Sequence, residues 1–219
     1  SALWETGGNL RKNCGHVDLS RAAEYGGYLQ FFAIFTEFPD YHEKYLHILE
    51  YLKQQLVENT DLVSFCKTGE DADLAAEQGK AAAFFTVEGA ELLNCDIGEL
   101  EKAKEAGLAA VNLTWNHANV LAGSKAERPE QGLTDQGRDF VRCCERLGVL
   151  VDVSHLSDPA FWDVIEMAKK PVIASHSDSR ALCAHPRNLT DKQFQALCGT
   201  GGAVGINLFS LFLGEKPTV

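Results

Sequence analysis

The sequence has no excess of basic residues, no C-x-x-C pair and no long apolar run. Lys and Arg number 20 against 31 Asp and Glu, so the net charge is −11. This charge argues against nucleic acid or an anionic membrane surface as a partner, because their phosphates would be repelled. No apolar stretch is long enough to span a bilayer, and we expect no membrane segment. The sequence has seven cysteines, an odd number, and none of them forms a C-x-x-C pair. This pattern favours reduced thiols over a disulfide framework or a cysteine-ligated zinc. We therefore expect a cytoplasmic protein.

Linkers, low-complexity segments and short repeats are also missing. The 219 residues are 45% hydrophobic and 23% charged, which is ordinary for a globular chain with one substantial core. We predict a single domain over 1–219. The first residues, SALWE, do not resemble a natural start, and we expect an N-terminal piece to be absent.

Apolar, β-branched runs alternate with amphipathic stretches along the chain. The runs predict strands over 28–35, 81–88, 109–115, 149–155, 171–176 and 202–209. The stretches between them predict helices over 40–57, 96–106, 134–147, 158–169 and 190–198. Near-continuous hydrophobic strands that alternate with helices indicate a parallel sheet covered on both faces.

No G-x-G-x-x-G turn follows any predicted strand, so these βα units favour a (β/α)8 TIM-type barrel over a dinucleotide-binding sheet. A full barrel has eight strands and about 250 residues. Six strands are predicted here. We therefore expect a barrel that is incomplete at both ends, with one strand missing at the front and one at the back.

Three side chains capable of binding metal follow predicted strands. Glu88 ends the strand 81–88, His155 ends 149–155 and His176 ends 171–176. In parallel α/β folds the carboxyl ends of the strands share one edge, where ligands and metals bind. One carboxylate and two imidazoles are a suitable ligand set for zinc or a similar metal. The sequence thus predicts a metal site formed by Glu88, His155 and His176.

Several blocks resemble the renal (membrane) dipeptidase family of metallopeptidases. They include GHVDLSRAAEYGGYLQFFAIF, VEGAELL, LTWNHANVLAGS, GLTDQGRDFVRCCERLGVLVDVSH and PVIASHSDSRALCAHPRNLTD, and they appear in family order from about Asn9 to Leu213. The resemblance implies an amidohydrolase-type (β/α)8 barrel with two zinc ions. It also implies a zinc-dependent dipeptidase, in which metal-activated water hydrolyses the peptide bond of a dipeptide.

Roles follow from the same resemblance, position by position. Glu88 corresponds to the catalytic carboxylate that bridges the two metals, and His155 and His176 correspond to the imidazole ligands of one zinc. Arg187 corresponds to the arginine that binds the substrate's carboxylate, a role suited to a bidentate guanidinium. Many relatives place a substrate-binding histidine directly after Leu-Thr, where this chain has Trp115. His117 stands two residues later and could bind substrate or pack in a loop.

Two further departures concern the ligands of the other metal and an acidic residue that handles protons in the family. The family supplies it through a His-x-Asp pair on a first strand, and here His16-Val17-Asp18 has that spacing but follows a polar segment. We predict that His16 and Asp18 belong to a loop with local hydrogen bonds rather than to a metal site. The acidic residue of the family's last strand has no counterpart in this chain. Whether both features exist in the full-length protein is not determined by this sequence.

Two alternatives remain open. A related amidohydrolase could act on another carboxylate-bearing amide or on a lactone, since loops on barrels change substrate. A non-catalytic barrel remnant could retain half a metal site, and its exposed sheet edges would favour a homodimer. The sequence determines neither the side-chain and stereochemical preference of a substrate, nor the native metal, nor the oligomeric state.

Overall fold

The computed structural model describes residues 1–37 and 40–214, and all statements about the structure concern these residues. The end of the predicted domain, 215–219, lies outside them. Five parallel strands form one sheet: β1 (Leu29–Ile34), β2 (Val63–Phe65), β3 (Ala81–Glu88), β4 (Leu108–Asn112) and β5 (Leu150–Asp152). The order is β1-β3-β4-β5, and β2 pairs with β3. A parallel sheet with helical connections confirms the predicted α/β class and accords with a TIM-type barrel.

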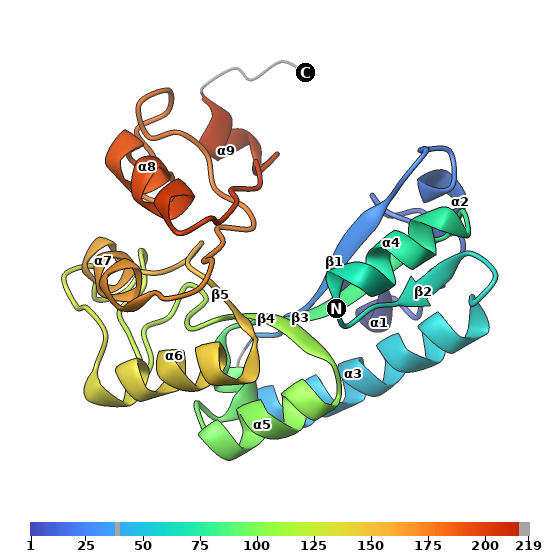
Figure 1. Cartoon of the computed structure of the whole chain (residues 1–219), viewed down its shortest axis with the longest axis horizontal. Coiled ribbons are helices and arrows are strands. Elements are labelled where there is room, and N and C mark those ends of the chain that lie inside the picture. Colours follow the sequence, from blue (N-terminus) through green and yellow to red (C-terminus); the bar gives the residue numbers. More distant parts are fainter. Residues whose placement is uncertain (38–39, 215–219) are drawn as a thin grey trace.

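Most of the helices that connect the strands lie along the outer side of the curved sheet (Figure 1), but the helix Gly69–Glu77 packs on the opposite face, against Ala82 and Phe84. The longer ones are α3 (Tyr41–Glu58), α4 (Gly69–Glu77), α5 (Ile97–Glu105), α6 (Asp135–Leu147), α7 (Asp158–Met167) and α8 (Asp191–Gly199). Short helical turns are α1 (Ala2–Glu5), α2 (Leu19–Ala22), the 3-10 turn η1 (Ala90–Leu93) and α9 (Ser210–Leu213). Among the described residues, no helix combines the length and apolar character that crossing a membrane requires.

Helix boundaries follow local capping chemistry. Thr134 accepts a hydrogen bond from the backbone of Gly137 at the start of α6, and Gly148 ends that helix in the left-handed conformation. Thr190 and Gln193 form a capping box at α8. Each of the five helices predicted from the sequence is present within one or two residues of its expected ends. The signals that set them are local, so they could be recognised in the sequence.

The strand predictions need corrections. The strand predicted over 149–155 is limited to Leu150–Asp152, so His155 lies beyond its end, and the strand predicted over 109–115 ends at Asn112. The predicted strands 171–176 and 202–209 are reduced to isolated parallel bridges, Asp152 with Ile173 and Ala174 with Val204. These bridges still continue the sheet beyond β5. Strand β2 and helix α4 were not predicted, because three strand residues carry no usable alternation of polar and apolar side chains and α4 buries only Ala75 completely.

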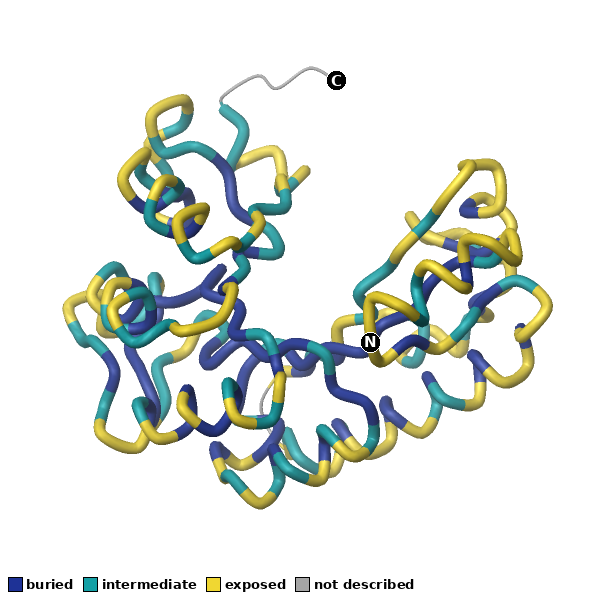
Figure 2. The backbone as a smooth tube through the Cα atoms, viewed as in Figure 1, coloured by how far each residue is buried: buried dark blue, intermediate teal, exposed yellow. Residues whose placement is uncertain are grey.

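The centre of the molecule lies around β3, where every residue from Ala81 to Val87 is buried (Figure 2). Helices α3, α5, α6 and α7 bury their apolar faces against the same core. At β3 the burial ends with Glu88, which is only half-buried. The core therefore holds the strands in register and leaves polar side chains at their carboxyl ends, and these ends form the candidate site.

Candidate metal centre

Glu88, His155 and His176 converge at the carboxyl edge of the sheet. The Oε1 atom of Glu88 lies 2.9 Å from Nε2 of His155 and 3.2 Å from Nε2 of His176. The two Nε2 atoms are 2.9 Å apart. Among the described residues this is the one group of three or more His, Cys, Asp or Glu side chains close enough to hold a metal ion together.

Strand register explains why residues so distant in sequence meet. Glu88 on β3 pairs with Asn112 on β4, and Asn112 pairs with Asp152 on β5. His155 follows β5 by three residues, and His176 follows the bridged residue Ala174 by two. Parallel strands present their carboxyl ends at one edge, so the three side chains reach the same point from neighbouring segments.

A buried carboxylate orients the segments that carry both histidines. Oδ1 of Asp152 accepts hydrogen bonds from the backbone and hydroxyl of Ser154, at 3.0 and 2.6 Å, and from the backbone of Ser175 at 3.1 Å. The Ser154 hydroxyl oxygen in turn accepts from the backbone N–H of His176 at 3.3 Å. The Ser175 hydroxyl lies 2.7 Å from Nδ1 of His176. Partners of this kind fix the ring orientation of a ligating histidine.

Electrostatics favour the protonation states that metal binding requires. Burial by itself raises the pKa of Glu88, but hydrogen bonds from His155 and His176 outweigh it and hold that pKa well below its usual range. Burial lowers the pKa of His155 to about 4, despite the opposing contact with Glu88. At neutral pH the carboxylate is therefore ionised and His155 is neutral, as ligands of a cation must be.

The donor set fits a small divalent cation. Bonds of about 2.0–2.1 Å in a tetrahedral zinc site place neighbouring ligand atoms about 3.3 Å apart. The observed separations of 2.9 to 3.2 Å require an expansion of only a few tenths of an ångström. Three lone-pair donors this close repel one another unless a cation or shared proton lies between them. Nδ1 of His155 is buried and finds no hydrogen-bond partner among the described residues.

Arg187 lies in the same cavity as the three donors. This cavity has a volume of about 630 Å³ and is lined by Glu88, Trp115, Asn116, Lys125, Ala126, His155, His176, His185, Pro186, Arg187, Asn207, Phe209 and Phe212. The guanidinium of Arg187 stacks over Phe212, 5.6 Å from the ring centre. Its Nη1 atom is buried without a partner among the described residues. Burial lowers the Arg187 pKa to about 10, so the group stays charged at neutral pH and is available to an anion.

His117 lies apart from these groups. Its side chain is 64% exposed, and its Nδ1 atom is 3.2 Å from Oε2 of Glu127. It does not line the cavity, whereas Trp115 does and packs 4.5 Å from the ring of Phe35. A residue two positions along a strand shares its face, but β4 ends at Asn112. The chain therefore turns before His117, and the substrate-binding role of His117 stays a prediction.

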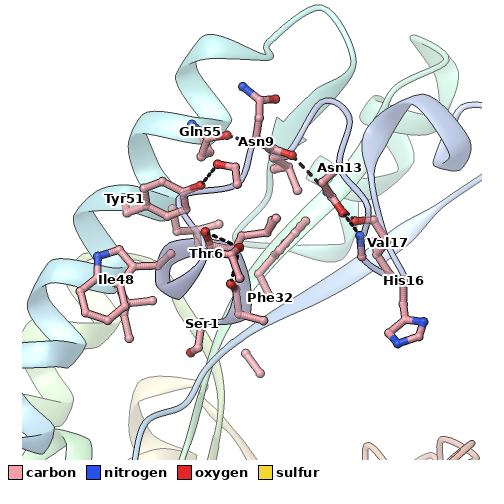
Figure 3. Close-up of a pocket in the computed structure, with 18 of the residues that line it drawn as sticks. Ser1, Thr6, Asn9, Asn13, His16, Val17, Phe32, Ile48, Tyr51 and Gln55 are labelled. Carbon is pink, nitrogen blue, oxygen red and sulfur yellow. Dashed lines mark hydrogen bonds between the residues drawn. The ribbon is translucent and has the colours of Figure 1, made fainter.

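His16 and Asp18 form no metal site with the other described residues. Asp18 caps α2 by accepting hydrogen bonds from the backbone and Nε of Arg21, both at 2.8 Å. His16 is exposed and stands at the rim of a second cavity, of about 810 Å³, between the N-terminal segment, β1 and α3 (Figure 3). That cavity is lined mainly by apolar side chains and contains none of the three metal donors. The predicted loop with local hydrogen bonds is confirmed.

Sequence patterns missed the polar residues that support the site. Asp152 lies within a strand-like run, and its spacing to Ser154 and Ser175 has no periodic signature. The aromatic wall formed by Phe209 and Phe212 comes from a segment that the sequence predicted as the end of a strand and its continuation. Asp152, Phe209 and Phe212 reach the site because of how the loops pack against the sheet, which a local sequence pattern does not encode.

Comparisons with known proteins show which family this chain is similar to. A family model described as membrane dipeptidase, peptidase family M19, matches residues 2–219. An uncharacterised protein in the PQQ-III 3′ region of Acinetobacter calcoaceticus is 31% identical over 226 residues, covering 91% of this chain and 72% of that protein. Dipeptidase tcpJ of Claviceps purpurea is 28% identical over 217 residues, covering 93% of this chain and 51% of the relative.

Similarity extends to solved structures. The crystal structure of the probable dipeptidase PvdM from Pseudomonas aeruginosa superposes with a TM-score of 0.85 at 25% identity. The match covers 97% of this chain and 58% of that one. The chain therefore spans a little over half the length of this structure and of the Claviceps relative.

Proposed function

Because this chain belongs to the membrane dipeptidase family, peptidase family M19, we propose that it acts as a zinc-dependent dipeptidase. The observation that carries the proposal is that one cavity contains both a set of candidate metal ligands and the guanidinium of Arg187. Three metal donors converge within 3.2 Å in it, and an unpaired buried guanidinium lines it as well. The set of ligands suits activation of water, and the guanidinium suits capture of a free carboxylate.

Glu88, His155 and His176 would hold one zinc ion, with Glu88 also reaching towards a second, as in the family. A bound zinc lowers the pKa of a water molecule towards neutrality and polarises a carbonyl oxygen. The chain's own part is to keep the donors deprotonated and oriented. The low pKa of Glu88 and the Asp152 hydrogen bonds to the histidine segments serve that purpose.

Arg187 would bind the terminal carboxylate of the substrate. A guanidinium binds a carboxylate through two parallel hydrogen bonds and so fixes its orientation. Trp115, Phe209 and Phe212 form an aromatic part of the cavity wall, which would shield the bound peptide from water on that side and strengthen these charge interactions. His117 remains a second candidate for contact with substrate.

Hydrolysis of a Gly-containing dipeptide, with zinc added to the metal-free protein, tests the proposal. We expect turnover that depends on zinc and falls at least about 100-fold in Glu88→Gln, because the substitution removes the ligand charge. Glu99→Gln is a matched control, since Glu99 pairs with His42 and Lys102 and none of these residues lines the cavity. Equal turnover by Glu88→Gln and the unmodified protein would overturn the scheme.

A related amidohydrolase activity on another carboxylate-bearing amide or a lactone uses the same groups, and the amidohydrolase of Pseudomonas aeruginosa is similar in fold, with a TM-score of 0.79 at 28% identity. A panel of dipeptides, N-acyl amino acids and lactones separates the two activities. A non-catalytic remnant would hold no more than one zinc per chain, which metal analysis detects.

Location and assembly are further parts of the proposal. All seven cysteines are free thiols, which favours a reducing, cytoplasmic environment. Cell fractionation tests this location. Strand β1 is an edge of the described sheet, and an exposed edge strand favours pairing with a second copy. Size-exclusion chromatography with light scattering tests for a homodimer.

A further inference from the structure

No hydrogen bond or ion pair joins the guanidinium of Arg187 to the other described residues, although the residue is only 7% exposed and its Nη1 atom is buried. The guanidinium stacks over the ring of Phe212. Because no hydrogen bond fixes the guanidinium itself, its position depends strongly on the backbone that carries it. What holds the backbone around Arg187 therefore decides where the guanidinium points.

Arg180 holds that backbone on both sides. Its Nε atom donates to the carbonyl of Asn188 at 2.8 Å, and its Nη2 atom donates to the carbonyl of Pro186 at 3.1 Å. The backbone N–H of Arg180 also donates to the carbonyl of Leu189 at 2.8 Å. One planar side chain thus ties the two residues that flank Arg187.

Arg180 is itself fixed by Asp158, at the start of α7. Nη1 and Nη2 of Arg180 donate to Oδ2 and Oδ1 of Asp158 at 2.9 and 3.1 Å. The same carboxylate accepts from Lys125, whose side chain is 6% exposed, and from Gln193 at 2.7 Å. Planar two-point pairing of this kind fixes geometry as well as charge.

Asp158 is also close in sequence to His155, one of the candidate metal ligands. It follows His155 by three residues, and the backbone N–H of Lys125 donates to the carbonyl of His155 at 3.0 Å. The carboxylate of Asp158 therefore joins the segment that carries a metal donor to the segment that carries Arg187.

We infer that Arg180, held by Asp158, is a positioning residue that fixes the distance between the metal donors and Arg187 and thereby sets selectivity for dipeptides. The inference rests on the proposed function. In a dipeptide the free carboxylate lies one residue beyond the scissile bond, and each further residue moves it by up to about 3.5 Å. A displacement of about 1 Å in a positioning group can cost 100-fold in rate, so the arginine must be held closely.

The test compares Arg180→Met and Arg180→Lys with the unmodified protein, loaded with zinc. The substrates are a Gly-containing dipeptide, the same dipeptide with an amidated carboxyl terminus, and a tripeptide. We expect kcat/KM for the free dipeptide to fall about 10- to 100-fold, mainly through KM, with the rate on the amide and the zinc affinity unchanged. Selectivity for dipeptide over tripeptide falls with it.

Arg138→Met is the matched control. Arg138 forms a comparable half-buried pair with Asp163, at 2.7 Å, between α6 and α7 and outside the cavity. We expect its kcat/KM values to stay within about twofold of the unmodified protein. Arg180→Lys keeps the charge but not the fork that spans both carbonyls, so it should lose the same selectivity and decides the matter if Arg180→Met does not fold.

Combination with Arg187→Met separates positioning from general damage. If Arg180 acts through Arg187, the double variant hydrolyses the dipeptide as fast as Arg187→Met alone. Additive losses, or equal losses on the dipeptide and its amide, would overturn the inference. If kcat/KM for the dipeptide falls in Arg187→Met but not in Arg180→Met, the positioning role of Arg180 is overturned while the carboxylate-binding role of Arg187 stands. No loss in Arg187→Met would overturn the carboxylate-binding role and the inference with it.

Discussion

The Nε2 atoms of His155 and His176 lie 2.9 Å apart although 21 positions separate the two residues in the sequence. Neighbouring parallel segments bring them together, because Asp152 on β5 is bridged to Ile173 in the segment that precedes His176. The two ring nitrogens and the carboxylate of Glu88 form a crowded polar cluster. A cation shared among these lone pairs stabilises such a cluster.

Metal removal should therefore lower the stability of the protein. We expect a chelator to lower the unfolding temperature and added zinc to restore it, since a ligand present at 100 times its Kd stabilises the folded state by about 2.7 kcal/mol. In His176→Ala, zinc should produce little or no shift, because one of three donors is lost. Differential scanning fluorimetry measures both effects. His47→Ala, on the exposed face of α3, serves as control and should respond to zinc like the unmodified protein.

Trp115 and His117 should differ in their effect on substrate. Trp115 lines the cavity that contains Glu88, His155 and His176, so we expect Trp115→Ala to raise KM for dipeptides about 10-fold through lost aromatic contact. His117 is 64% exposed, and an exposed side chain contributes little unless the substrate reaches it. Steady-state kinetics of His117→Ala decides this point. A rise in KM equal to that of Trp115→Ala would assign His117 to the substrate site.

Acid should weaken the Asp158 cluster. Burial alone raises the pKa of Asp158, but hydrogen bonds from Arg180 and Lys125 outweigh it and hold the pKa well below its usual range. A carboxyl group with a lowered folded-state pKa stabilises the protein above its unfolded pKa of about 4, and this stability is lost as pH falls towards the folded value. The free energy of unfolding should thus decrease below about pH 5 more steeply in the unmodified protein than in Asp158→Asn.

Urea unfolding of the metal-free proteins at several pH values between 6 and 2 measures this difference. Asp139→Asn is the control, since Asp139 forms an exposed pair with Arg142 on one helix. Parallel pH profiles for Asp158→Asn and the unmodified protein would contradict the assigned role of the cluster in stability.

Substitution by alanine should affect the free energy of unfolding differently at two glycines in helices. At Gly137 in α6 an added Cβ would lie 2.1 Å from the carbonyl oxygen of Leu121, whereas at Gly199 in α8 it would meet nothing within 4 Å. Gly199→Ala should be neutral or stabilising by up to about 1 kcal/mol from helix propensity. Gly137→Ala should destabilise by about 1–3 kcal/mol despite the same propensity gain. Equilibrium urea unfolding compares the two, and a stable Gly137→Ala protein would show that Leu121 can move aside.

Local chemistry made much of the fold predictable. The helix that ends at Gly148 could be recognised because its cap and its left-handed glycine are signals within a few residues. The same holds for Glu88, which follows a buried apolar run and so had to emerge at a strand end. Strand β2 and helix α4 escaped prediction because β2 has only three residues and α4 buries only Ala75 completely, so neither carries a readable pattern of polar and apolar side chains.

By itself, the sequence determined that strands alternate with helices and that a carboxylate and two histidines follow buried runs, because these features depend on periodicity and on parallel connection alone. Only the tertiary structure decided that His117 turns outward, that Asp18 caps a helix, and that Arg187 lies unpaired over Phe212. Loop positions depend on packing between distant segments and on hydrogen bonds such as those of Arg180, and no local pattern encodes them.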